Sequence, residues 1–188
     1  MAELETSAPA RGLGLPLVRR GCRLEALDPG PVWQVSPYPG RLAALDKALK
    51  PLGFRFPQPG EVLAGKGGAR LVWAGRESAF LIGAAAPEGL PAALVDQSDG
   101  WVALHIEGAA VLGVLARLVA VDLRDQALAA PASLRSQLGH LPVLIIKNAP
   151  QAFEIWSYRS MAASLVHELD EAMRGVAARS ETGSGQGL

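Results

Sequence analysis

The sequence predicts an α+β fold in which two strand-helix-strand-helix halves form one domain with a mainly antiparallel sheet. Three observations lead to this prediction. Segments with strand patterns come in pairs joined by short turns, which is typical of hairpins. Only a few segments place apolar residues at helical spacing, and too much strand separates them for a helix bundle. The same order of strands and helices occurs twice, with the boundary near residue 94.

Length and composition indicate a single folded domain with mobile ends. The chain has 188 residues, of which 49% are apolar and 19% are charged, as is usual in globular proteins. The two ends contain mostly small, polar and turn-forming residues. We therefore expect a flexible segment over 1–15, a domain over 16–178 with halves at about 16–93 and 94–178, and a flexible tail over 179–188.

In the first half we expect a strand, an amphipathic helix and a hairpin. Residues 33–36 have a strand pattern that ends at the turn-forming run 37–40. A helix that ends at Pro51 and Gly53 then places four leucines on one face: Leu42, Leu45, Leu49 and Leu52. The remaining expectations are a loop over 57–68, hairpin strands over 69–74 and 78–83, and one short helix within 87–95.

The second half is expected to contain four strands and two helices. Asp99-Gly100 suits a tight turn before the first strand, because both residues tolerate positive φ. A buried helix with a broad apolar stripe is expected to begin at Gly108 and to end before Asp122. A final helix is expected from about Ser160 to Ala178. The four expected strands are 101–106, 134–138, 143–146 and 153–158.

Residues 60–67 match most of the G-x-x-x-x-G-K pattern of a phosphate-binding loop. Gly67 stands where that pattern needs a Ser or Thr hydroxyl for magnesium. Pro57 and Pro59 precede the segment instead of a strand, and a strand is expected to follow instead of a helix. We therefore expect a glycine-rich surface loop that binds no nucleotide.

No pattern of titratable residues predicts a complete active site. The chain has three histidines, none at metal-ligand spacing: His105, His140 and His167. His167 and Glu168 could form a catalytic pair in space, but polar residues of an amphipathic helix usually face solvent. Asp96 and Asp99 could act as paired carboxylates, although the turn accounts for Asp99. We assign no catalytic, cofactor-binding or metal-binding residue to this chain.

The expected location is the cytoplasm. The single cysteine, Cys22, indicates a reducing compartment, and neighbouring arginines could lower its pKa, although we do not expect a reactive thiol. The acidic N-terminus lacks the pattern of a secretory signal, and the apolar stretch 108–121 is too short to span a membrane. The 18 basic residues balance 18 acidic ones, which argues against nucleic-acid binding.

The tryptophans indicate a protein that binds other proteins. All four fall in expected strands: Trp33, Trp73, Trp101 and Trp156. We expect most of them in the core and one or two at an interface, because Trp is enriched at binding hot spots. An apolar chain without a reaction centre fits the role of a subunit.

Three segments carry a resemblance to a known family. They are DQSDGWVAL at 96–104, LVAVDL at 118–123 and YRSMAASLVHEL at 158–169. With these segments the chain resembles the sarcosine oxidase gamma-subunit family over about residues 30 to 175, most strongly after 94. The tails and the 57–68 loop contribute nothing to the resemblance, and the matching residues include no catalytic motif.

The resemblance implies a structural subunit of a heterotetramer with alpha, beta and delta subunits. That complex oxidises sarcosine to glycine, passes the one-carbon unit to tetrahydrofolate and forms hydrogen peroxide. FAD, FMN, NAD and tetrahydrofolate are expected on the partner subunits and none on this chain alone. The gamma subunit is similar in fold to the folate-binding domain of aminomethyltransferases, which agrees with the repeated order of elements.

Two alternatives stay open. One is a free-standing folate-binding or aminomethyl-transferring protein of the same fold. It would need a pocket between the halves and a carboxylate, for which Asp96, Asp99 and Glu107 are the candidates. The other is a scaffolding protein unrelated to sarcosine.

Overall fold

The structure is a computed structural model that describes residues 7–85 and 87–183, with side chains up to residue 179. Its strands form two antiparallel sheets. The first sheet has six strands in the order β1-β2-β8-β11-β10-β9. Their bounds are β1 Leu17–Arg19, β2 Cys22–Leu27, β8 Trp101–Glu107, β9 Ala132–Leu138, β10 Leu141–Ala149 and β11 Ala152–Tyr158.

The second sheet has five strands in the order β4-β5-β6-β3-β7. Their bounds are β3 Val32–Pro37, β4 Val62–Ala64, β5 Arg70–Gly75, β6 Ser78–Ile82 and β7 Ala92–Asp96. The helices are α1 Leu42–Leu49, α2 Val111–Leu115 and α3 Ala162–Gly183, with short 3-10 turns at Lys50–Leu52, Lys66–Gly68 and Arg159–Met161.

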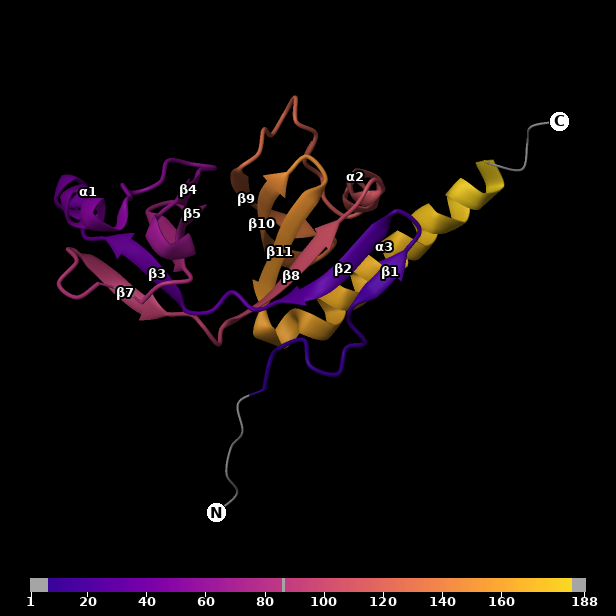
Figure 1. Ribbon diagram of the computed structural model, residues 1–188, viewed down its shortest axis with the longest axis horizontal. Helices are drawn as coiled ribbons and strands as arrows, with labels where there is room; N and C mark the ends of the chain where they lie inside the picture. The colour runs from indigo at the N-terminus through magenta and orange to yellow at the C-terminus, as the bar shows by residue number, and fades with distance from the viewer. Residues whose placement is uncertain (1–6, 86, 184–188) are drawn as a thin grey trace, which may run out of the picture.

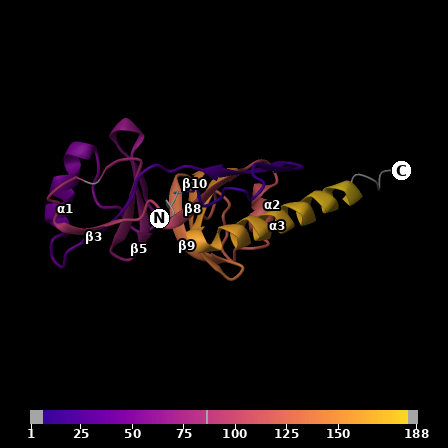
Figure 2. The same cartoon turned by 90° about the horizontal axis from the view of Figure 1, so that it is seen from below.

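The elements stack in four layers. Going from left to right in Figures 1 and 2, α1 is followed by the second sheet, the first sheet, and then α2 and α3. Three apolar clusters fill the spaces between these layers. Each sheet is therefore covered by helix on one side and by the other sheet on part of the opposite side.

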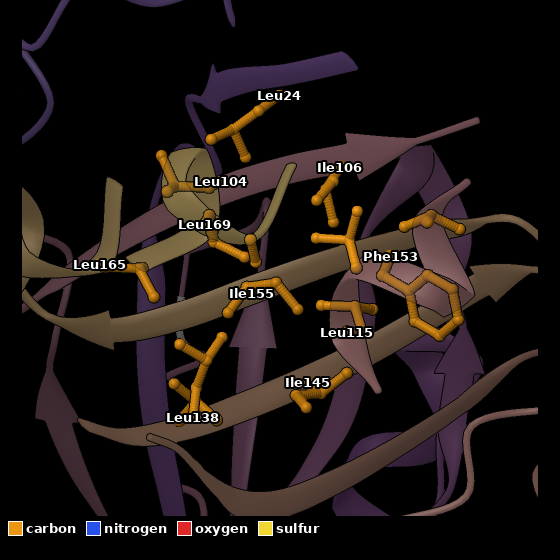
Figure 3. Packing of buried hydrophobic residues seen from close by; sticks show 14 of the residues in the cluster. Leu24, Leu104, Ile106, Leu115, Leu138, Ile145, Phe153, Ile155, Leu165 and Leu169 are labelled. Carbon is orange, nitrogen blue, oxygen red and sulfur yellow. The ribbon is translucent and has the colours of Figure 1, made fainter. Parts of the chain in front are cut away.

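The largest cluster lies between the first sheet and the helices α2 and α3. Alternate residues of β8, such as Leu104 and Ile106, point to this side together with Ile155 of β11. Leu165 and Leu169, four residues apart on α3, point back at them (Figure 3). All five side chains have no exposed surface. The period-2 pattern of the strands and the helical spacing in α3 thus meet in one core.

The predicted α+β fold with mainly antiparallel sheet is confirmed. One predicted helix, within 87–95, is wrong. Residues 87–95, expected to hold a short helix, instead form a turn and most of β7, which pairs with β3. Alanine and leucine favour helix locally, but backbone pairing with β3 overrides that weak preference. Among its described residues, the first half therefore contains one α-helix, α1.

The helix expected from Gly108 to before Asp122 is much shorter in the structure. α2 covers five residues, after which the chain continues in turns to Val119. The amide of Gly139, in the β9–β10 turn, donates to the Leu118 carbonyl at 2.9 Å. The expected burial of this segment is confirmed, because Val114, Leu115 and Val119 lie in the core.

Two strands near the N-terminus escaped the sequence reasoning. β1 and β2 form a hairpin that joins the first sheet through β8, although all other strands of that sheet come from the second half of the chain. Ala10, Leu13 and Leu15, which we expected in a flexible segment, pack against the large core. The first part of that expected segment, residues 1–6, lies outside the described residues, as does the end of the expected C-terminal tail, 184–188.

Candidate functional site

Asp96 and Asp99, the candidate paired carboxylates, both interact with residues near them. Asp96 Oδ1 accepts hydrogen bonds from the Ser98 hydroxyl at 2.6 Å and the Ser98 amide at 2.9 Å, which lower the pKa of Asp96. The Asp99 side chain is 84% exposed and lies 3.7 Å from Arg159. Both carboxylates are exposed, and Asp99 lines a surface cavity of about 420 Å³ together with Arg159.

The histidines lie on three different elements. His105 on β8 lies 3.3 Å from Glu107, a neighbour on the same face of the strand. His140 lies in the exposed β9–β10 turn, and His167 is exposed on α3 beside the half-buried Glu168. Within the described part of the chain, no three His, Cys, Asp or Glu side chains gather where they could hold a metal ion.

Cys22 lies on β2 with its side chain in the large core. Burial raises the pKa of its thiol to about 11, so the thiol is protonated near neutral pH. The neighbouring arginines do not overcome this effect. Cys22 is a core residue here.

The glycine-rich segment 60–67 does not have the geometry of a phosphate-binding loop. It contains the short strand β4 and the start of a single 3-10 turn, and β5 follows where a phosphate loop has a helix. Lys66 Nζ donates to the Pro51 carbonyl at 2.9 Å. A Cβ on Gly65 would lie 2.2 Å from the Phe54 ring, so this glycine is needed for packing.

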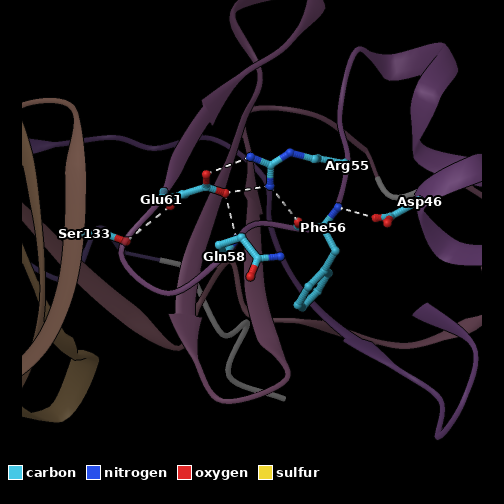
Figure 4. Close-up of polar contacts among 6 residues, drawn as sticks. All are labelled: Asp46, Arg55, Phe56, Gln58, Glu61 and Ser133. Atoms are coloured by element: carbon cyan, nitrogen blue, oxygen red, sulfur yellow. Dashed lines mark hydrogen bonds and ion pairs between the residues drawn. The ribbon is translucent and has the colours of Figure 1, made fainter. Parts of the chain in front are cut away.

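A polar network orders the chain just before this segment (Figure 4). Arg55 forms two hydrogen bonds of 2.7 Å with the Glu61 carboxylate, which also accepts from the Gln58 amide. The Arg55 hydrogen bonds are the main reason why the pKa of Glu61 is lowered. Asp46 on α1 accepts from the Phe56 amide at 2.7 Å. These contacts fix the loop against α1 and β4.

The tryptophans fall into two pairs. Trp101 and Trp156 are buried between the two sheets, where Phe80 lies edge-on to Trp101 with ring centroids 5.2 Å apart. Trp33 and Trp73 are half-buried on the second sheet. Only the second pair can offer surface to another protein.

Sequence reasoning missed a buried polar network between the sheets. Arg70 on β5 donates to both carboxylate oxygens of Glu154 on β11, at 2.7 and 3.1 Å. Asn148 and the Trp156 indole N–H donate to the same carboxylate at 2.9 and 3.0 Å. A signal existed in the sequence, because Glu154 stands among large apolar residues in a strand, where a charge is usually buried with a partner.

The Glu154 side chain is only 6% exposed. Burial alone would raise the pKa of this carboxyl, but the hydrogen bonds from Arg70, Asn148 and Trp156 and the charge of Arg70 outweigh it and lower the pKa. Glu154 is therefore ionised near neutral pH and acts as a clamp between β5 and β11.

Side chains fill the contact between the two sheets. Besides the clamp, the space holds an apolar cluster that includes Val72, Leu144 and Ile146. Ser133 at the start of β9 also joins the sheets, donating from its amide to the Gly60 carbonyl at 2.8 Å and from its hydroxyl to the Trp73 carbonyl at 2.9 Å. Asp96, Asp99 and Glu107, the candidate folate carboxylates, are all exposed.

A surface groove on the second sheet collects exposed apolar side chains. It has a cavity volume of about 320 Å³ and is lined by Tyr38, Leu42, Phe56, Trp73 and several prolines, together with Arg76 and Glu77. Tyr38 is 52% exposed and Leu42 is 45% exposed. We call it the Trp73 groove. Aromatic side chains are enriched at protein-binding surfaces.

Comparison with known proteins identifies a similar fold. No family model matches the sequence, and no curated protein matches it significantly. Among solved structures, the chain is similar to one in heterotetrameric sarcosine oxidase from Corynebacterium sp. U-96 in complex with pyrrole 2-carboxylate. The TM-score is 0.78 at 23% sequence identity, covering 92% of this chain and 96% of that chain. This chain has that fold.

The aligned share of each chain shows how their lengths compare. Because the alignment spans nearly all of both chains, the two chains have similar lengths. The likeness is therefore to a whole small chain of that complex and not to one domain of a larger chain. In the part of the chain that the structure describes, no helix is long and apolar enough to cross a membrane.

Proposed function

We propose that this chain is the gamma subunit of a heterotetrameric sarcosine oxidase and acts in assembly of the complex. The observation that carries the proposal is the fold similarity over almost the full length of both chains, with a structure named as a heterotetramer. The three sequence segments that resemble the gamma-subunit family agree with it. The alpha, beta and delta subunits are the proposed partners, and the cytoplasm is the proposed location.

The positions of the titratable residues support a non-catalytic role. The carboxylates Asp96, Asp99 and Glu107 and the pair His167 and Glu168 lie at exposed or half-buried positions on separate elements. General acids and bases, in contrast, usually lie in a cleft together with the reacting groups. FAD, FMN, NAD and tetrahydrofolate are therefore proposed to bind to the partner subunits.

The alternative of a free-standing folate-binding protein has less support. Such a site needs a pocket between the halves, and the sheets meet there through buried side chains and the Glu154 clamp. Two of its candidate carboxylates line different cavities, because Asp99 lines one of about 420 Å³ together with Arg159 and Glu107 lines one of about 720 Å³ beside β2. These two carboxylates therefore do not converge on one site. The experiment below separates the two functions.

The deciding experiment is to express the tagged chain in its native host and to identify what co-purifies. We expect large flavoprotein subunits, sarcosine oxidation by the complex, and a colourless isolated chain. Alanine at Asp96, Asp99, His167 or Glu168 should leave turnover per flavin within about threefold, because general acids and bases typically contribute about 100-fold or more. A monomer that holds folate or flavin would contradict the proposal.

The Trp73 groove gives a prediction for assembly. Tyr38→Ala removes an aromatic side chain that is 52% exposed, so the isolated chain should keep its stability. If the groove is covered in the complex, loss of this aromatic contact should weaken binding by about 2 kcal/mol, or roughly 30-fold. Mass photometry of the purified subunits measures the dissociation constant, and complexes that do assemble should turn over normally.

The matched control is Tyr158→Ala. Tyr158 is 43% exposed but lies on the first sheet, where its ring is 5.0 Å from that of Trp101. We expect the control to bind the partners as the wild type does. Equal binding by both variants and the wild type would show that the Trp73 groove is not an interface.

A further inference from the structure

The strand β7 is an open edge of the second sheet. It pairs with β3 on one side, and it is the last strand in the order of that sheet. In Figure 1 it runs along the lower margin of the sheet, on the side away from β5 and β6. A strand in this position presents backbone groups that can pair with another strand.

The register shows which backbone groups are free. Tyr38 donates to the Pro91 carbonyl, and Gln97 donates to the Val32 carbonyl, at the two ends of the β3–β7 pairing. Hydrogen-bonded pairs alternate along an antiparallel ladder, so Ala93 and Val95 face β3. The amide and carbonyl of Leu94 therefore point outward, and no hydrogen bond to them occurs among the residues described.

β7 has few of the features that normally protect an edge strand. Its sequence is Ala-Ala-Leu-Val-Asp, with no Lys, Arg or Pro and with one charge, Asp96, at its end. The edge strands β1 and β4 have only three residues each, and β9 carries Arg135 and is joined to the second sheet through Ser133. The Val95 side chain beside this open edge is 48% exposed. β7 is thus the edge of this fold that is best suited to pairing.

We propose that an extended segment of a larger partner chain adds to the second sheet by pairing with β7, with an apolar side chain against Val95. The outward amide and carbonyl of Leu94 select a strand as the occupant, and the exposed valine selects an apolar neighbour. The edge is continuous with the Trp73 groove, because Tyr38 donates to the Pro91 carbonyl where β7 begins. This inference rests on the proposed function.

The test is Leu94→Pro in the chain co-expressed with its partner subunits. Proline removes the outward amide of Leu94 and breaks no hydrogen bond of the β3–β7 ladder, which edge strands tolerate. We expect the fraction of chain found in the complex to fall by about tenfold or more, because the added strand loses a backbone hydrogen bond and its close approach. Mass photometry of the purified complex gives that fraction.

Two further variants keep the test decisive. Leu94→Ala loses the half-buried side chain but keeps the amide, and it should assemble as the wild type does. Val95→Lys places a charge on the open edge at an exposed position, and it should reduce assembly even if the proline variant folds poorly. Thermal unfolding of each isolated chain shows whether the variant is folded.

The experiment distinguishes a failure of the proposed function from a failure of the β7 inference. If the wild-type chain does not co-purify with flavoprotein subunits, the proposed function fails. If it does, and Leu94→Pro and Val95→Lys assemble equally well, the β7 inference is wrong while the proposed function stands. If the isolated wild type is a dimer that either variant makes monomeric, the edge pairs with a second copy of this chain, which also overturns the inference.

Discussion

Glu154→Ala is expected to lower the free energy of unfolding by about 3–5 kcal/mol, because it leaves the Arg70 guanidinium without its partner between the sheets. The Asn148 amide and the Trp156 indole N–H lose the same acceptor. Urea unfolding of the isolated chain measures the change. A loss below about 1 kcal/mol would mean that the clamp is not important for the contact between the sheets.

The surface pair Arg55–Glu61 is the matched control. It has the same residue types and two hydrogen bonds of 2.7 Å, but the two side chains are 50% and 33% exposed. Exposed pairs gain little because water screens the charges and already solvates both groups. Glu61→Ala should therefore have a much smaller effect than Glu154→Ala.

The same clamp predicts a pH dependence. The pKa of Glu154 in the folded protein lies below its ordinary value of 4.5. A carboxyl whose pKa is lower in the folded state stabilises the protein above its unfolded pKa, and this contribution disappears as the pH falls through the folded pKa. Stability should therefore decrease as the pH falls below about 4.5. Repeating the titration with Glu154→Gln should reduce that decrease.

Lys147→Met is expected to destabilise the protein by about 3 kcal/mol, because it removes charge-assisted hydrogen bonds inside the protein. The Lys147 side chain is fully buried, and its Nζ donates to the carbonyls of Leu123 and Leu128 at 2.7 and 2.8 Å. Methionine keeps the length of the side chain but leaves both carbonyls without this donor. Hydrogen exchange should increase over 122–130, the connection between α2 and β9.

Asp125→Asn separates the ion pair from the carbonyl contacts. Asp125 Oδ1 lies 2.5 Å from Lys147 Nζ, but the Asp125 side chain is 51% exposed. We expect a much smaller loss of stability than for Lys147→Met, and little change in exchange over 122–130. Equal effects of the two variants would show that the ion pair, and not the carbonyl contacts, holds this connection.

Strong local patterns allowed several elements to be predicted. The spacing of Leu45 and Leu49 located α1, and the spacing of Leu165 and Leu169 located α3. The apolar runs of β8, β10 and β11 were also recognised, because strands buried on both faces contain few polar residues. These patterns arise from side chains of one short segment facing one core, so they are visible without a structure.

Other elements depended on distant partners. β7 has no strong strand pattern and forms because β3 supplies hydrogen bonds to Ala93 and Val95. β2 alternates Cys22 and Leu24 with Arg23 and Glu25, a strand signal that we overlooked, but no local signal places it beside β8. The short length of α2 likewise depends on tertiary contacts, including the hydrogen bond from Gly139 to Leu118.

The sequence by itself determined the fold class, the positions of most strands and two of the helices, because these follow from the local periodicity of apolar residues. It also showed that no familiar catalytic motif is present in the chain. Only the tertiary structure decided the partners of the buried charges Lys147 and Glu154, and the edge position of β7. Ion pairs and strand neighbours bring together residues that are far apart in the chain. The local pattern of a sequence does not show which of these distant residues are in contact.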